Sequence, residues 1–474
     1  MMQKTLLLTT ALFLAFAAFA QQKEVKAYTV KEAVDYALQN NNAVKNARLD
    51  VQKAKWRNLE IYSTGLPKID ANFDYTYYFK PPISPALGKA FSGGVLGNVF
   101  GLLAYGDGTP ANPGNPALQS ILNTPQEPVS FILPHNISTG VQVTQLLFDG
   151  RYVFGVKASK DLTKTARLSA DMSDFEVKYS VMKAYYNAAA AAEGKALLTE
   201  NLGLIDKLLS DTRKTFQEGL IEELDVNRLE LAQATLNSQI ALQNQMAEVA
   251  LANLKFQMGL SLNEEIILKD RLDELKTSVQ AELGVTQFDP KNRIEYNMLE
   301  TGIRLKGFEW RAKQSPYFPS LYAFMNYGWQ SQAQASKDVF KKDSWFDQGL
   351  VGLTLKIPIF DSGEKMAQVQ QTKLDQQKLK NDFENFKNAS ELQFRAAQSS
   401  FASALTDEAN SRRANDLSKK IFDRNTIKYK EGVANSFELQ QSQQDLVTNQ
   451  LKFIQSSLNI LNTKADLDKA LGKK

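Results

Sequence analysis

The stretch Phe216–Leu220 reads FQEGL, and 213 residues later Tyr429–Val433 reads YKEGV. Gly259 likewise recurs at the same separation as Gly472. A separation held over so long a stretch is typical of long helices whose length is fixed by a packing partner, whereas a loop-rich enzyme would drift. The chain is therefore predicted to consist of two internal repeats.

Composition narrows the class of protein. The chain has 474 residues, no cysteine, one histidine and a formal net charge of +4, with both signs of charge mixed along it. Mixed charges are typical of solvated helices and give no argument for nucleic-acid binding. His135 has no second His or Cys to join it, so no metal or cofactor is expected. The sequence also lacks a phosphate-binding GxxxxGK[ST] loop, and we expect no enzyme.

Residues 1–20 predict a secretory signal peptide. Lys4 precedes an apolar run from Leu6 to Phe19, and Ala18-Phe19-Ala20 is a small-x-small cleavage site. No other run of 18 or more apolar residues exists, so no helix is expected to cross a bilayer. An exported chain without disulfides has to be held together by packing.

Periodicity and turn signals divide the mature chain into two repeats joined by a linker at 261–290. The first repeat, 21–260, is predicted to contain a helix (29–63), two strands (71–79 and 139–148) and two long helices (151–218 and 222–258). The second repeat, 291–474, is predicted to contain a helix (293–314), two strands (320–330 and 350–360) and two long helices (363–430 and 434–470). Thr29 and Glu32 have the spacing of a capping box at the start of the first helix.

The long helices carry narrow apolar seams. In the first repeat the seam positions are spaced 4, 3, 4, 3, 4: Leu198, Leu202, Ile205, Leu209, Thr212 and Phe216. The last helix has the same spacing: Val447, Leu451, Ile454, Leu458, Leu461 and Ala465. This spacing predicts antiparallel coiled-coil hairpins that turn at Gly219 and Gly432.

Each predicted strand is about 10 residues long with one apolar face, which is typical of transmembrane β-strands. Aromatic residues end these faces, as in an interface girdle: Tyr75, Tyr77, Phe79, Tyr327 and Trp329. The alternative is a half-buried sheet of a soluble protein, but the helices offer no broad apolar layer to cover one. A sheet in lipid has to close, and four strands cannot close alone. Several chains must contribute, and this reasoning leaves two, three or four subunits open.

The order of these elements resembles the outer membrane efflux protein family of TolC-like channels. The resemblance runs from Tyr28 to Gly472. It rests on Leu66-Pro67 and the matching Phe318-Pro319 before the first strand of each repeat, the Phe-Asp motif at the end of the second strand, the Glu-Gly hairpin turns and the terminal LxxxxG. It implies a homotrimer with a 12-stranded β-barrel in the outer membrane, continued by an α-helical tunnel in the periplasm.

The resemblance also implies a function and partners. The channel is expected to be the exit duct of a tripartite efflux or type I secretion system that exports small molecules or proteins. Its partners would be a periplasmic adaptor protein, an inner-membrane pump of RND or ABC type, and outer membrane lipid. Substrate and pump stay open. The alternative, from another class, is a soluble periplasmic coiled-coil adaptor or scaffold.

Candidate gate residues follow from the same resemblance. Asp225 and Glu438 match acidic positions that form rings at the periplasmic entrance of the family's channels. Gln441 stands where the family has a second acid, and Ala434 stands where it has an arginine that tethers the closed hairpins. The alternative is that both acids serve only the helix dipole in a first helical turn.

The hairpin turns are the family's docking end for the adaptor. The residues implied here are Glu218, Gly219, Leu220, Glu431, Gly432 and Val433. A structural reading of the two glycines is also open, because positive φ is needed at a helix C-terminus. Segment 80–137, rich in proline, is expected outside the cell, and its role stays open.

Overall fold

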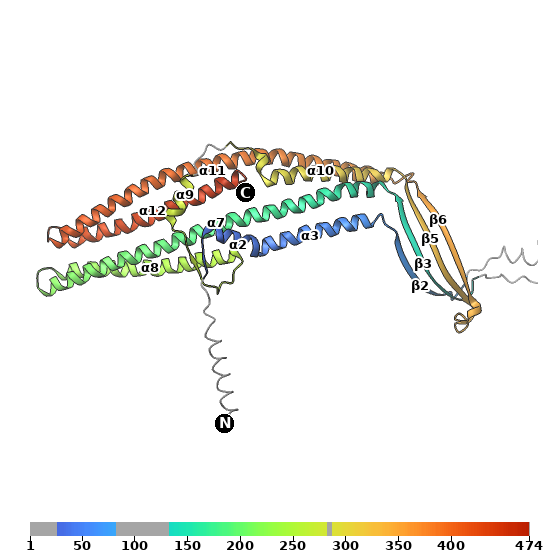
Figure 1. Ribbon diagram of the computed structural model, residues 1–474, viewed down its shortest axis with the longest axis horizontal. Coiled ribbons are helices and arrows are strands. Elements are labelled where there is room, and N and C mark those ends of the chain that lie inside the picture. The colour runs from blue at the N-terminus through green and yellow to red at the C-terminus, as the bar shows by residue number, and fades with distance from the viewer. Residues whose placement is uncertain (1–25, 82–131, 282–286, 474) are drawn as a thin grey trace, which may run out of the picture. The chain divides into compact units, whose positions relative to one another are not determined.

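A computed structural model describes residues 26–81, 132–281 and 287–473. The signal peptide predicted for 1–20 and most of segment 80–137 therefore lie outside the described residues. The chain order is β1 (Lys26–Tyr28), α2 (Val30–Asn40), α3 (Asn42–Ser63), β2 (Lys68–Tyr77), β3 (His135–Phe148), α7 (Gly150–Gln217), α8 (Glu223–Met258), β4 (Ile266–Leu268), α9 (Leu272–Ala281), η2 (Pro290–Asn292), α10 (Ile294–Gln314), η3 (Ser315–Tyr317), β5 (Ser320–Ala333), η4 (Lys342–Ser344), β6 (Trp345–Lys356), α11 (Glu364–Lys430) and α12 (Ser436–Ala470) (Figure 1).

The chain divides into two compact units. Within the described residues, a sheet unit comprises 59–156 and 310–369, and a helical unit comprises 26–58, 157–309 and 370–473. These units do not coincide with the predicted segments 21–260 and 291–474, since each segment contributes to both units. The reason is that strands from both halves hydrogen-bond in one sheet, while the long helices of both halves pack together.

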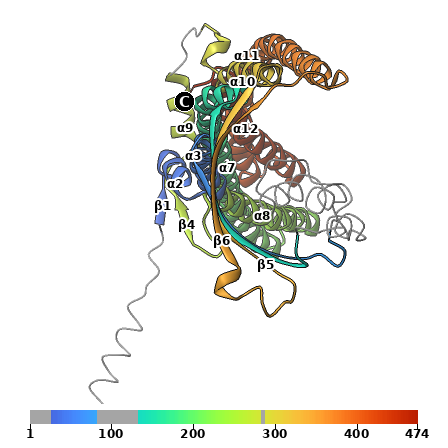
Figure 2. The ribbon, with the colours of Figure 1, turned by 90° about the vertical axis from the view of Figure 1, so that its right-hand side faces the viewer.

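The sheet unit contains one antiparallel sheet in the order β2-β3-β5-β6 (Figure 1). Figure 2 shows the same sheet nearly edge-on, as a twisted ribbon. The sheet extends beyond the predicted strands at several ends: β2 begins at Lys68, β3 at His135 and β6 at Trp345. These additional residues pair in register with neighbours, Lys68 with Thr144 for example, which a period-2 pattern in one strand alone does not reveal.

The register gives the sheet two different faces. One face carries aliphatic and aromatic side chains, among them Ile69, Phe73, Tyr75, Tyr77, Val141, Val143, Met325, Tyr327, Trp329, Val351, Leu353 and Leu355. The opposite face is mainly polar in β2 and β3 and carries Lys68, Asp70, Asn72, Asp74, Thr144 and Gln142. The apolar face is open to solvent in the single chain: Val351 is 81% exposed, and Leu353 is 69% exposed.

The outer strands of this sheet each have one unpaired edge. In the described part of the chain, β2 pairs only with β3, and β6 pairs only with β5. Such edges present free backbone N–H and C=O groups that another strand can pair with. The sheet of one chain is therefore incomplete.

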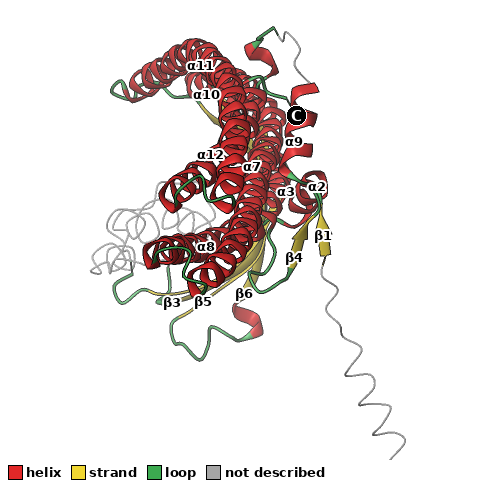
Figure 3. Cartoon of the chain, turned by 90° about the vertical axis from the view of Figure 1, so that its left-hand side faces the viewer, coloured by secondary structure: helices red, strands yellow, loops and turns green. Residues whose placement is uncertain are grey.

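The helical unit contains two long antiparallel hairpins, α7 with α8 and α11 with α12 (Figures 1 and 3). All four helices match their predicted bounds within two residues. Their ends pack into one buried cluster with members from each helix: Leu198, Ile205, Leu208, Leu209, Val226, Leu229, Ala232, Leu236, Phe422, Leu439, Leu446 and Val447. Among the described residues, no helix combines the length and apolar character that a membrane span requires.

The predicted seams are buried at most of their positions. On α7, Leu198 and Ile205 are each 1% exposed. Phe216 departs from the prediction because it is exposed, one residue before the helix ends. On α12, five of the six seam positions are buried: Val447, Ile454, Leu458, Leu461 and Ala465.

The single helix predicted for 29–63 is wrong, because the chain leaves helical geometry at Asn41. The Asn41 side chain accepts from the Ala43 amide at 2.7 Å and donates to the Gln257 carbonyl oxygen at 2.7 Å. A Cβ at Gly259 would lie 2.9 Å from the Asn40 carbonyl oxygen, so these segments meet closely. The break thus comes from a tertiary contact. The capping box of Thr29 and Glu32 is confirmed.

The linker predicted for 261–290 contains β4 and α9, while its residues 282–286 lie outside the description. The strand β4 pairs in parallel with β1, joining Lys26 to Ile266 in register. The hydroxyl of Tyr185, on α7, donates to the Tyr28 carbonyl oxygen at 2.8 Å. Burial raises the pKa of Tyr185 to about 12, so this phenol stays neutral and able to donate.

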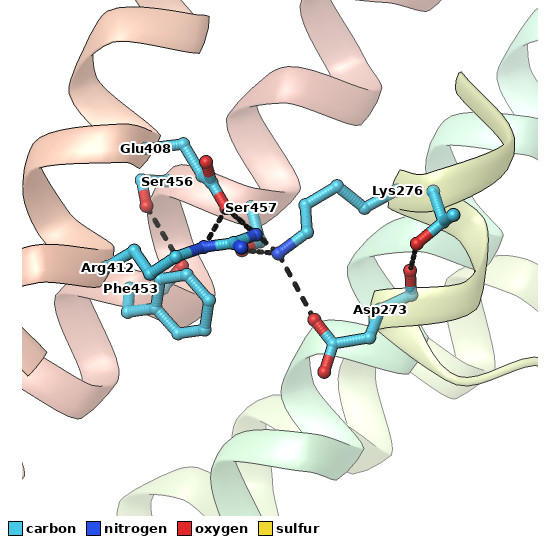
Figure 4. A network of polar contacts seen from close by, with 8 residues as sticks. Asp273, Lys276, Glu408, Arg412, Phe453, Ser456 and Ser457 are labelled. Carbon is cyan, nitrogen blue, oxygen red and sulfur yellow. Dashed lines mark hydrogen bonds and ion pairs between the residues drawn. The ribbon is translucent and has the colours of Figure 1, made fainter. Parts of the chain in front are cut away.

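The helix α9 is tied to α11 by a buried ion pair (Figure 4). Lys276, 2% exposed, places Nζ 2.9 Å from Glu408 Oε1, 3.1 Å from Asp273 Oδ1 and 4.6 Å from the Phe453 ring centroid on α12. Arg412 also donates to Glu408 Oε1, at 2.8 Å. Burial alone raises the pKa of Glu408, but the hydrogen bonds from Lys276 and Arg412 outweigh it and hold the pKa below its ordinary value.

Candidate functional site at the hairpin ends

Both hairpins turn through the same backbone motif. Gly219 and Gly432 each have φ of +74°, in the left-handed region that glycine adopts without steric cost. The Gly219 amide donates to the Phe216 carbonyl oxygen at 2.9 Å, and the Leu220 amide donates to that of Thr215 at 3.2 Å. This is a Schellman motif, which satisfies the last carbonyls of a helix.

The second turn repeats the motif. The Gly432 amide donates to the Tyr429 carbonyl oxygen at 3.0 Å, and the Val433 amide donates to that of Lys428 at 2.9 Å. The side chains at the turns face solvent, since Leu220 is 71% exposed and Val433 is 74% exposed. The turns therefore present an apolar residue at each hairpin end.

Asp225 lies in the first turn of α8 and contacts the other hairpin. Its carboxylate accepts a short hydrogen bond from the hydroxyl of Ser436, the first residue of α12. Arg228 Nη1 donates to the same Ser436 Oγ at 3.0 Å, and its guanidinium lies 5.6 Å from the ring centroid of Phe437. Ser436 is fully buried, whereas Asp225 and Arg228 remain partly exposed.

A second contact joins α7 to α11. The hydroxyls of Thr212 and Tyr429 lie 3.3 Å apart, within hydrogen-bond distance. Burial raises the pKa of Tyr429, and the charge of Asp225 raises it further, whereas the contact with Thr212 lowers it. Near the turns, two polar contacts therefore connect the hairpins within one chain. Further along the helices, α7 and α12 are also joined by Asn201–Gln450, Lys183–Asp466 and Glu176–Lys469.

Glu438 and Gln441 have different surroundings from Asp225. Glu438 is exposed, and its backbone amide donates to the Asn435 side chain at 2.9 Å, which caps α12. Gln441 is also exposed, and its Nε2 donates to Asp445 Oδ1 at 3.0 Å. Asp225 and Glu438 both sit in the first turn of a helix, where the dipole favours a carboxylate. One chain does not bring these acids into a ring.

A cavity of about 740 Å³ lies between the two hairpin ends. Asp211, Glu222, Asp225 and Glu431 contribute to its lining, with Lys430 as the basic residue. Ala434, where the resemblance places a family arginine, also lines it. Ala434 thus faces solvent-filled space, and the polar contact between the hairpins beside it is made by Ser436.

Sequence reasoning did not find the residues that connect the hairpins. Ser436 and Arg228 carry no motif, while Thr212 lies on a predicted seam and Tyr429 begins the YKEGV motif. None of these patterns reveals the link, because it depends on how the hairpins pack. The capping role of Asn435 could have been predicted from the sequence, because Asn followed three residues later by Glu is an N-terminal helix signal. In the described part of the chain, no three His, Cys, Asp or Glu side chains are grouped so that they could hold a metal ion.

The sequence of residues 307–473 matches the profile of a family described as outer membrane efflux protein. The match covers 167 of the 474 residues, from α10 to α12. The recognition made from the turn and repeat motifs is thereby confirmed for the second half of the chain. The family is one of channel proteins, in agreement with the expectation of no enzyme at the level of the family. No curated protein matches the sequence at a significant level.

Solved structures extend the likeness to the whole fold. CusC, described as forming a transmembrane channel, superposes with a TM-score of 0.70 at 14% identity, covering 96% of this chain and 96% of its own. The CmeC outer membrane channel of Campylobacter jejuni has a TM-score of 0.70 at 16% identity, covering 96% and 90%. The MtrE outer membrane channel of Neisseria gonorrhoeae has a TM-score of 0.66 at 17% identity, covering 94% and 88%. The chain has the same fold as these channels.

Proposed function

We propose that the protein is the outer membrane exit duct of a tripartite efflux or type I secretion system. The observation that carries this proposal is the four-stranded sheet with one exposed apolar face and two unpaired edges. Lipid would cover the apolar face, and pairing of β2 with β6 of a neighbouring chain would remove both edges. Because an open edge is not tolerated in lipid, the sheet closes only in an oligomer.

Three chains give a barrel of twelve strands, within the range of about 8 to 26 known for membrane barrels. The polar face of the sheet then lines the channel, and the α7–α8 and α11–α12 hairpins form a periplasmic tunnel. A periplasmic adaptor and an inner-membrane pump of RND or ABC type complete the system. A soluble adaptor or scaffold has no use for an exposed apolar face that includes Ile69 and Val351, so this alternative is less well supported.

The test uses the full chain expressed with its own leader. We expect it in the outer membrane fraction, extractable only with detergent, and as a trimer after chemical cross-linking. The purified trimer is expected to form ion-conducting channels in planar lipid bilayers. Recovery of a monomer from the soluble periplasm would exclude the channel and favour the scaffold.

The gate of this channel is proposed at Asp225 and Glu438, with Gln441 next to them. Three copies of each acid around a threefold axis make rings that favour cations. The double variant Asp225→Asn, Glu438→Gln is expected to reduce the preference for K⁺ over Cl⁻, measured as a reversal potential in a salt gradient. Glu248→Gln, an exposed acid further along α8, is the matched control. An unchanged reversal potential in the double variant would remove the gate assignment.

The adaptor is proposed to dock at the hairpin turns, on Glu218, Gly219, Leu220, Glu431, Gly432 and Val433. The exposed side chains of Leu220 and Val433 supply apolar contact there. Leu220→Asp with Val433→Asp is expected to weaken binding to the adaptor encoded with this protein, measured by surface plasmon resonance, while bilayer conductance stays intact. Unchanged adaptor affinity would place the docking surface elsewhere on the helices.

A further inference from the structure

The sheet unit contains a cavity of about 450 Å³ that the gate and the docking ends do not use. It lies where the loop after α3, the ends of β2 and β3 and the start of α7 come together. Its apolar lining includes Ile61, Leu66, Leu146, Tyr152 and Tyr322. A pocket of roughly 300 to 1,000 Å³ with mainly apolar walls and a few polar groups is typical of small-molecule sites.

The strand register fixes the face on which this cavity opens. Lys68 pairs with Thr144, and Leu146 pairs with Tyr322, so these four lining residues share one face of the sheet. That face is the polar one, opposite to the face of Ile69 and Val143. In the proposed channel it is the wall along which cargo passes.

The charges of the cavity leave one cation unbalanced. Asp149, whose side chain is 9% exposed, accepts from Arg151 Nη2 at 2.7 Å and from Arg151 Nε at 3.2 Å. The Tyr322 hydroxyl also donates to Asp149, at 3.5 Å. The charges of Asp149 and Arg151 therefore cancel. Lys68 has no ion-pair partner among the described residues, so the cavity carries a net charge of about +1.

The aromatic wall of the cavity is held in place. A Cβ at Gly65 would lie 2.3 Å from the Tyr152 ring, so glycine lets this ring pack directly on the backbone. Tyr152 also donates to the Tyr62 carbonyl oxygen at 3.5 Å. Gly155 is not crowded in this way, since a Cβ there would meet only Ile61, at 3.6 Å. Gly155 thus lines open space that a larger side chain could fill.

We propose that this cavity binds small amphiphilic cargo with an aromatic or aliphatic body and one anionic group. The Lys68 ammonium pairs with the anion, and the body lies on Leu66, Leu146, Tyr152 and Tyr322. The site is a contact point on the channel wall and makes anionic amphiphiles a cargo class of the duct. This inference rests on the proposed function, because only the closed barrel makes the polar face a channel wall.

The test measures binding of 1-naphthalenesulfonate, by fluorescence anisotropy, to the trimer in phosphatidylcholine nanodiscs. Empty nanodiscs give the background. The neutral 1-naphthalenemethanol is the matched probe without the charge. We expect the sulfonate to bind the wild type about tenfold more tightly than the alcohol, since one partly exposed charge pair contributes on this order.

Three variants separate the contributions. Lys68→Gln is expected to lower sulfonate affinity about tenfold and to leave the alcohol unchanged. Gly155→Leu is expected to abolish binding of both probes by filling the cavity. Lys337→Gln removes an exposed lysine from the loop between β5 and β6, outside the lining of this cavity, and it is expected to bind like the wild type.

The outcomes distinguish this site from the channel itself. A trimer that conducts but binds neither probe, or binds both equally, overturns the inference and leaves the proposed function standing. Equal loss in Lys68→Gln and Lys337→Gln would indicate a diffuse electrostatic field and also overturn the inference. Displacement of the sulfonate by phosphatidylglycerol added to the nanodiscs would assign the cavity to lipid rather than cargo. Failure to form trimers at all would instead contradict the channel.

Discussion

The two helical hairpins have nearly equal lengths and the same turn motif, but different residues pack them. α7 and α11 have 68 and 67 residues, and α8 and α12 have 36 and 35. Three buried apolar positions of the first hairpin correspond, 213 residues on, to buried serines of the second: Leu198, Ile205 and Leu229 against Ser411, Ser418 and Ser442.

The substitution of serine changes what holds the second hairpin. Hydroxyls of Ser418 and Ser442 donate to carbonyl oxygens of their own helices, at 2.6 Å and 2.9 Å, so they add no link to a neighbour. At each of these three positions, the serine lacks about 1.5–3 kcal/mol of apolar burial that a leucine or isoleucine contributes. The first hairpin is thus stabilised by its apolar core. In the second hairpin α12 keeps an apolar seam, whereas α11 buries mainly polar residues. Among the polar ties of α11, Lys276–Glu408 is the most buried.

Of the changes considered, removal of the Lys276–Glu408 ion pair is expected to destabilise the second hairpin most relative to the first. Lys276→Ala leaves Glu408 buried without its main partner, and breaking a buried pair costs about 3–5 kcal/mol. We expect amides of α11 and α12 to exchange hydrogen faster by a corresponding factor, measured by hydrogen-exchange mass spectrometry, while α7 changes little. The double variant Lys276→Met, Glu408→Leu is the control and should restore most protection. Equal loss of protection in α7 would show that the two hairpins open together.

Paired core substitutions come next in size. Leu229→Ala in the first hairpin is expected to cost about 2–5 kcal/mol, because Leu229 is fully buried and leaves a cavity. Ser442→Ala, at the corresponding position of the second hairpin, is expected to change stability by less than about 0.5 kcal/mol. Thermal melting of the trimer in detergent, followed by circular dichroism, measures both. Similar losses at the two positions would contradict the unequal packing.

Acid is expected to weaken the second hairpin through Glu408. Its pKa lies below the ordinary value in the folded chain, so its contribution to stability is complete above the ordinary Glu pKa of about 4.3 and is lost as the pH falls through the lowered value. The melting temperature of the wild type should therefore fall between pH 5 and pH 3 more than that of Lys276→Met, Glu408→Leu. A parallel fall in both proteins would assign the acid sensitivity to other carboxylates.

The tie at the hairpin ends is expected to be the weakest of those considered. Ser436→Ala removes the hydroxyl that joins Asp225 and Arg228, at a cost of about 1 kcal/mol. Single-channel recordings are expected to show more frequent opening in this variant. Ser442→Ala, also buried but bonded only within α12, is the matched control. Identical open probability in both variants would exclude Ser436 as a tie that restrains opening.

The sequence predicts those parts of the fold that repeat a period. Seam spacing and turn signals located the four long helices within two residues, and alternation located the four strands with ends that differ by up to five residues. The helix break at Asn41 was not predicted, because it depends on the close approach of Gly259, which no local sequence pattern records. The strands β1 and β4 are three residues each, too short for a period.

The sequence predicts where the hairpin ends lie but not which residues connect the two hairpins there. Glycine at the turns and acids one turn later mark the hairpin ends from sequence alone. The bridge from Asp225 to Ser436 and Arg228 depends on the relative position of two hairpins 211 residues apart in the chain. That relation is a property of packing, so it becomes visible only in three dimensions.

The parallel pairing of β1 with β4 constrains the order in which parts of the chain can fold. Lys26–Tyr28 remains without its strand partner until Ile266–Leu268 has been delivered, after the whole α7–α8 hairpin. Contacts between segments so distant in sequence form late, because a long loop has to close first. A chain that enters the periplasm N-terminus first therefore has an unpaired first strand until most of the chain has been exported. Periplasmic chaperones would bind the chain during that interval.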